Sequence, residues 1–160
     1  MTYTRSWVFV LVTLLCAFIL TLLPMPEWAA WMRPAWIVMT LIYWVTATPL
    51  QVNVGTAWLV GIFLDVLNGT ILGEHAFALT LVAYFAARIY SRFRMFTVMQ
   101  QGLWIFVFVL LYQFILFCIQ GFIGDLPKSW LYWSPPLTSM LLWPWVFIII
   151  RDSRRRFKVA

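Results

Sequence analysis

The sequence predicts an all-α integral membrane protein with six transmembrane helices. The 160-residue chain is 64% hydrophobic and only 10% charged, whereas soluble domains carry about a quarter charged residues. Its apolar residues fall into six runs, which are separated by proline, glycine or charged residues. Most of its eleven lysines and arginines fall on segments that would share one side of a six-span protein.

The first three expected spans cover residues 7–23, 35–48 and 52–67. The first is closed by Pro24 and Pro26. The second begins after Arg33 and stops before Pro49, because the residue before a proline is disfavoured in a helix. The third ends at an Asn-Gly pair at 68–69, a typical signal for a helix C-terminus.

The last three expected spans cover residues 76–90, 102–123 and 136–150, and a basic tail follows at 151–160. The fifth span is the longest, and the sixth contains Pro144. Several runs have about 16 residues, shorter than the roughly 20 that a bilayer requires. These spans must therefore recruit flanking residues or lie in a locally thinned membrane.

The distribution of basic residues predicts that both termini are cytoplasmic. Only Arg33 and Lys128 would then lie outside. A protein with four spans would divide the basic residues between the two sides in the same way. Only the length of the apolar sequence therefore favours six spans over four. The nine basic residues expected inside are Arg5, Arg88, Arg92, Arg94, Arg151, Arg154, Arg155, Arg156 and Lys158.

Few residues are available for catalysis or cofactor binding. The only histidine, His75, is expected to be a solvated loop residue, and Asp65 is the only carboxylate at membrane depth. The sequence has no Ser-His-acid set, zinc motif, CxxC pair or phosphate-binding glycine loop. We therefore expect no enzyme, no cofactor and no metal site. Nucleic-acid binding is also disfavoured, because the basic residues lie beside membrane spans.

A stripe of small residues marks the third span. Ala57, Gly61, Asp65 and Gly69 recur every four residues, so a helix places them on one face. Small residues at this spacing let membrane helices approach closely. Asp65 should therefore face protein, where it would form a structural ion pair, contact a partner or ligand, or be solvated at the interface.

The sequence also suggests a partner for Asp65. The second and third spans share a short connection, so Arg33 and Asp65 should lie at depths that differ by only about 3 Å. Each charge is at the unfavourable end of its own helix dipole. These positions predict an ion pair between Arg33 and Asp65, with two parallel hydrogen bonds.

Two glutamines and three arginines are further candidate binding residues. Gln113 and Gln120 share a face of the fifth span, where their amides should bond within the bundle or to another chain. The tail residues Arg154, Arg155 and Arg156 are expected to bind either anionic lipid or a cytoplasmic partner.

Several motifs resemble those of the rod shape-determining protein family MreD, and the resemblance covers nearly the whole chain. LWPW stands just before the basic tail, and RPAW, which includes Pro34, opens the second span. The motifs are RPAW at 33–36, VNVGT at 52–56, GxxLD at 61–65, Gly69, LG at 72–73, AY at 83–84 and LWPW at 142–145.

The resemblance implies a multi-pass protein of the bacterial inner membrane without enzymatic activity. It implies a scaffold of the elongation complex that helps to coordinate lateral peptidoglycan synthesis. Its main partner would be the bitopic protein MreC, with MreB, RodZ, RodA and a class B penicillin-binding protein as further partners. The sequence leaves open whether the chain forms a homodimer.

The resemblance also implies a bundle like that of the S-components of energy-coupling-factor transporters. The alternative function is therefore a small-molecule-binding transport subunit. S-components tend to carry an A-x-x-x-A pattern on their first helix, where this chain offers only Ala17. The outer loops are short, and few polar residues are available to line a solute pocket. A scaffold is thus the preferred interpretation.

Overall fold

The computed structural model describes residues 2–158, which form helices and their connecting segments without any β-strand. The expected all-α fold is therefore confirmed. The helices are α1 (Thr2–Leu22), α2 (Glu27–Ala30), α3 (Trp36–Ala47), α4 (Val54–Asn68), α5 (Glu74–Phe93), α6 (Val98–Ile123), the 3-10 helix η1 (Trp130–Trp133) and α7 (Pro135–Arg156).

Three segments among the described residues are long and apolar enough to cross a membrane. They are Thr4–Leu22 in α1, the whole of α6, and Trp130–Arg156, which combines η1 with α7. Helices α3 and α4 are apolar but shorter. The presence of six membrane-spanning helices remains a prediction.

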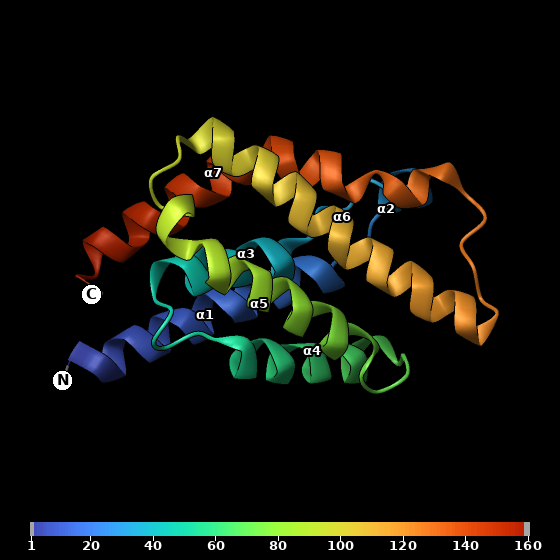
Figure 1. Cartoon of the computed structure of the whole chain (residues 1–160), viewed down its shortest axis with the longest axis horizontal. Coiled ribbons are helices and arrows are strands. Elements are labelled where there is room, and N and C mark those ends of the chain that lie inside the picture. Colours follow the sequence, from blue (N-terminus) through green and yellow to red (C-terminus); the bar gives the residue numbers. More distant parts are fainter. Residues whose placement is uncertain (1, 159–160) are drawn as a thin grey trace.

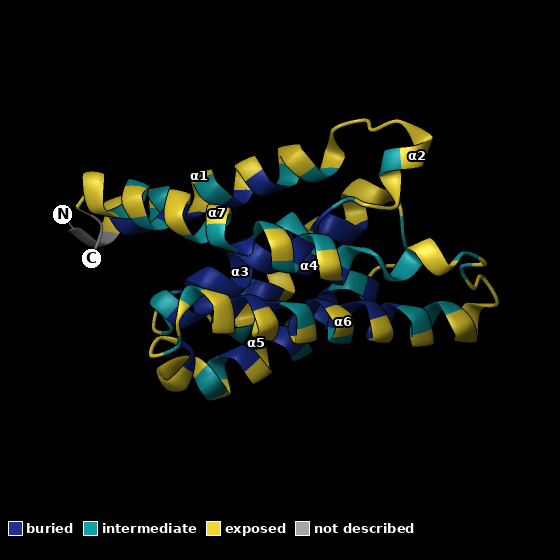
Figure 2. Cartoon of the chain, turned by 90° about the horizontal axis from the view of Figure 1, so that it is seen from above, coloured by how far each residue is buried: buried dark blue, intermediate teal, exposed yellow. Residues whose placement is uncertain are grey.

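The six longer helices run up and down, so α1 begins at the same end of the bundle at which α7 finishes. Figures 1 and 2 place the beginning of α1 beside the end of α7. We call this the terminal end of the bundle. The opposite end, here the distal end, holds the α4–α5 turn, α2 and the segment that joins α6 to α7 (Figure 1).

The core is built around α3. Ten of its twelve residues are buried, and it packs against α1, α5 and α7. Figure 2 shows this helix in the buried colour inside the bundle, whereas α1 shows much exposed surface. The indole of Trp44 is fully buried, and its Nε1–H donates to Thr13 Oγ1 of α1 over 2.9 Å. A helix that is apolar on all sides is suited to this central position.

Local sequence explains where the helices begin and end. Asn53 caps α4, because its Oδ1 accepts from the backbone of Gly55 and Thr56. Thr97 and Gln100 form a capping box at the start of α6. Gly124 ends α6 with a φ of 87°, a left-handed conformation that favours glycine.

Candidate functional site

Helices α4 and α5 meet closely along the small-residue stripe. Ala57, Gly61 and Asp65 are buried. A Cβ atom added to Gly61 would lie 2.2 Å from the Cα of Ala76 and 2.6 Å from its backbone nitrogen. Only glycine fits at this crossing. The stripe is therefore used inside the protein, between two of its own helices.

Asp65 lies four residues beyond Gly61 and contacts the same turn of α5. Its side chain is fully buried. Oδ1 accepts from the His75 ring at 2.7 Å, the His75 backbone at 2.9 Å and Thr70 Oγ1 at 3.1 Å. Oδ2 accepts from the backbone of Gly73 at 2.9 Å and of Ala76 at 3.4 Å. Five donors thus converge on one carboxylate.

This carboxylate acts as the missing cap of α5. The N-cap residue of that helix is Gly73, which has no side chain to accept from the free N–H groups of the first turn. Asp65 accepts from three of these groups across the helix pair, where its negative charge also complements the helix dipole.

The expectation for His75 was wrong. Its side chain is only 12% exposed and is held by Asp65. Because a carboxylate only accepts, Nδ1 of His75 carries the proton. Thr70 Oγ1 also approaches Nδ1, at 3.4 Å. The Thr70 hydroxyl and the Asp65 carboxylate therefore both approach Nδ1 of His75. In a catalytic triad the hydroxyl and the carboxylate bond to different nitrogens of the histidine ring. This arrangement is structural.

Gly69 does not continue the stripe into the helix contact. It is exposed and ends α4 in the left-handed conformation, with a φ of 66°. The backbone N–H of Thr70 donates to the carbonyl of Asp65, and that of Gly69 donates to Val66. This pattern is a Schellman motif, which turns the chain toward α5.

The predicted ion pair between Arg33 and Asp65 was also wrong. Arg33 instead donates from its guanidinium to the backbone carbonyls of Thr21 and Leu23. These carbonyls belong to the end of α1, where a cation complements the negative end of the helix dipole. Arg33 thus caps α1. The charges of Arg33 and Asp65 thus each stabilise the end of a neighbouring helix, α1 and α5 respectively.

The two glutamines of α6 bond within the chain. Gln113 Nε2 donates to the carbonyl of Tyr132 at 2.9 Å, and Gln120 Nε2 donates to Glu74 Oε1 at 3.1 Å. The Tyr132 hydroxyl in turn donates to the carbonyl of Gln113. The intramolecular alternative for these amides is therefore the one observed. Glu74, the partner of Gln120, is buried at the start of α5.

A cavity of about 260 Å³ opens among these groups at the distal end. Arg33 and Pro34 line it together with His75, Tyr112 and Gln113. Arg33 Nε and Gln113 Oε1 are buried and form no hydrogen bond with any described residue. Arg33 and Gln113 therefore each line the cavity and each carry one buried polar atom without a hydrogen-bond partner among the described residues. The part of the chain described holds no cluster of three or more metal-ligating side chains.

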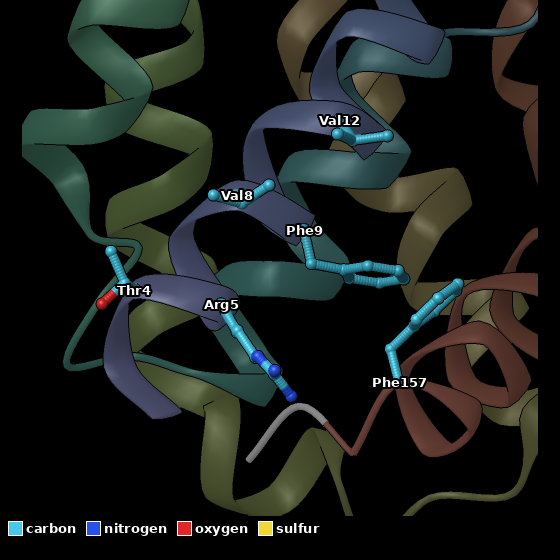
Figure 3. A pocket seen from close by; sticks show the side chains of 6 residues that line it. All are labelled: Thr4, Arg5, Val8, Phe9, Val12 and Phe157. Atoms are coloured by element: carbon cyan, nitrogen blue, oxygen red, sulfur yellow. The ribbon is translucent and has the colours of Figure 1, made fainter. Parts of the chain in front are cut away.

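The terminal end carries the basic tail and an apolar groove. Arg154, Arg155 and Arg156 occupy the last turn of α7, where positive charge complements the helix dipole. The groove, of about 510 Å³, lies between α1 and the end of α7. Figure 3 shows the rings of Phe9 and Phe157 beside each other, with their centroids 5.8 Å apart, and Val8 and Val12 on the same helix as Phe9.

Comparison with known proteins gives one consistent result. The chain matches the model of the family described as "rod shape-determining protein MreD" over residues 1–153. It is 34% identical over 160 residues to the rod shape-determining protein MreD of Haemophilus influenzae, covering 98% of this chain and 97% of that protein. No solved structure matches the chain significantly. The similarity extends from the first helix into α7.

Proposed function

The chain belongs to the MreD family of rod shape-determining proteins, and from this premise we propose that it is a scaffold of the rod-shape machinery in the bacterial inner membrane. In this role it binds MreC and helps to coordinate lateral peptidoglycan synthesis. MreB, RodZ, RodA and a class B penicillin-binding protein are its further partners by family resemblance. The observation that carries the proposal is the family match along almost the whole chain.

A non-catalytic role is supported by how the polar residues are used. Asp65 caps α5 and holds the His75 ring, and Gln113 and Gln120 join α6 to its neighbours. The main hydrogen bonds of these four side chains therefore hold the helices of the bundle together. A protein built in this way acts through the surface that it presents to partners.

Ala57, Gly61 and Asp65 of the small-residue stripe are buried, so a partner helix must bind elsewhere. Helix α1 leaves Val8, Leu11 and Leu15 more than half exposed. The groove between α1 and α7 is lined mainly by apolar side chains, including Val8 and Val12 (Figure 3). We place the transmembrane helix of MreC in this groove, where side-chain packing would hold it.

A complementation experiment tests the scaffold role. Deleting the gene in its host should turn rods into spheres, and the wild-type gene should restore them. Val12→Trp should fail to restore rods and should lose co-purification of MreC, because the indole fills the groove. Leu11→Trp is the matched control: Leu11 is similarly exposed on the same helix but lies outside the groove. A deletion strain of normal width and length would refute the proposal.

A second experiment tests the proposed topology. Single cysteines at residues 5, 92 and 158 should be labelled only from the cytoplasm, and those at 27, 71 and 128 only from outside. Position 71 represents the α4–α5 turn, because Ile71 is exposed whereas Glu74 is buried. Cys16 and Cys118 are exposed and must first be replaced. Labelling of residue 158 from outside would contradict the six-span topology.

The distal cavity favours a second candidate function, the binding of a small solute. Its lining includes Arg33 and Gln113, whose guanidinium and amide groups are suited to a ligand that both accepts and donates hydrogen bonds. Native mass spectrometry of the purified protein distinguishes the two functions. A bound small molecule that disappears in Gln113→Leu would favour solute binding.

A further inference from the structure

Arginines from two helix ends face a common cavity at the terminal end. This cavity of about 360 Å³ lies where α3, α5, α6 and α7 meet. Arg94 follows α5, and Arg151, Arg154 and Arg155 come from α7. Arg156 does not line it. Within the basic tail, Arg151, Arg154 and Arg155 therefore line the cavity, whereas Arg156 lies outside it.

The positive charge of this cavity is only partly offset by the protein, through the end of the α7 helix dipole and Asp152. No aspartate or glutamate is among its lining residues. Asp152 Oδ1 lies 3.5 Å from Arg151 Nε, but both side chains are well exposed and the nitrogen forms no hydrogen bond. Such an exposed contact contributes little. Gathering cations around one space is unfavourable unless an anion occupies it.

The walls of the cavity are held in place by buried hydrogen bonds. Gln101 of α6 donates from Nε2 to the carbonyl of Phe93 at the end of α5. Its Oε1 accepts from the indole of Trp143 in α7 at 3.3 Å. One buried amide thus joins the three helices that carry or support the arginines. The helix ends that carry the arginines are therefore held in fixed positions relative to one another.

We propose that this cavity binds the phosphate group of an anionic phospholipid. It lies at the basic end of the bundle, where the helices reach the membrane surface and lipid phosphates are concentrated. Guanidinium groups bind phosphate oxygens through paired, charge-assisted hydrogen bonds. Phe147 and Tyr43 line the cavity beside the arginines and suit the start of the acyl chains. This inference is independent of MreC binding.

The experiment uses the full-length protein in mixed-lipid nanodiscs, with phosphatidylglycerol and phosphatidylcholine as probes. Native mass spectrometry should detect selective retention of phosphatidylglycerol. Arg94→Gln with Arg154→Gln should lower this retention about tenfold or more, since each tenfold corresponds to about 1.4 kcal/mol. Arg92→Gln with Arg156→Gln is the control: it removes the same charge from the same two helix ends outside the cavity.

Each alternative has its own outcome. Equal losses in both double variants would show diffuse attraction to the tail and overturn the proposal. Displacement of the lipid by millimolar inorganic phosphate would identify a site for free anions instead. If the Arg94→Gln, Arg154→Gln variant does not fold, the lipid retention of the wild-type protein still tests the proposal. Equal retention of phosphatidylglycerol and phosphatidylcholine would refute the site. Arg94→Lys with Arg154→Lys should retain the fold and show an intermediate loss.

Discussion

Replacing Gly61 by alanine should prevent stable packing of α4 against α5. The new Cβ would lie 2.2 Å from a backbone atom of Ala76, so no side-chain rotation can relieve the overlap. Overpacking usually costs about 1–3 kcal/mol, and we expect at least the upper end here. The same displacement would move the α5 turn away from Asp65. Thermal unfolding in detergent, followed by tryptophan fluorescence, measures the effect.

Gly102→Ala is the matched control for this substitution. Gly102 is also buried in a helix, but its added Cβ would meet Met140 at an ordinary distance of 3.6 Å. Alanine also favours helices by up to about 1 kcal/mol over glycine. We expect unchanged or slightly higher stability. Equal losses in the two variants would mean that the approach of α4 to α5 is not the critical contact.

Removing the carboxylate of Asp65 should be the other most damaging change. Asp65→Ala leaves buried donors of the first α5 turn without an acceptor, and we expect a loss of about 3–5 kcal/mol. Asp65→Asn keeps one acceptor oxygen but turns an NH₂ group toward other donors, so its effect should be intermediate. Hydrogen exchange should rise first at the amides of Gly73 and His75. Unchanged protection there would contradict the cap.

Double variants separate the observed contacts of Asp65 from the pair that the sequence suggested. Asp65 and His75 bond directly, so Asp65→Ala and His75→Ala should be less than additive by about 1 kcal/mol or more. Arg33 and Asp65 share no hydrogen-bond partner. Arg33→Ala and Asp65→Ala should therefore add within about 0.5 kcal/mol. Coupling between Arg33 and Asp65 would contradict their separate capping roles.

Periodicity and helix-ending signals made the helical segments predictable. The Asn-Gly pair at 68–69 marks the observed end of α4, and the spacing of Ala57, Gly61 and Asp65 indicated a protein-facing surface. Sequence also predicted that the two glutamines would find partners. It did not identify these partners, because Tyr132 and Glu74 lie 19 and 46 residues away along the chain.

The errors at Arg33 and His75 share one physical cause. The sequence showed correctly that Arg33 and Asp65 oppose the dipoles of their own helices. It did not show which other helix ends lie beside them, and each charge is favourably placed at one of these ends. The start of α5, where His75 lies, carried one weak signal. Gly73 has no side chain to cap α5, so an acceptor from elsewhere was required near His75.

The burial of α3 affects how the protein enters the membrane. Twelve residues extend about 18 Å as a helix, well short of a bilayer core of roughly 30 Å. Lipid contact therefore contributes little to holding α3 in place, and its threonines bond to its own backbone. Its stable insertion depends on α1, which is made before it, and on α5 and α7, which are made later. Until α7 leaves the ribosome, α3 lacks part of its final surroundings, so we expect the packing of α3 to be completed only after α7 has been made.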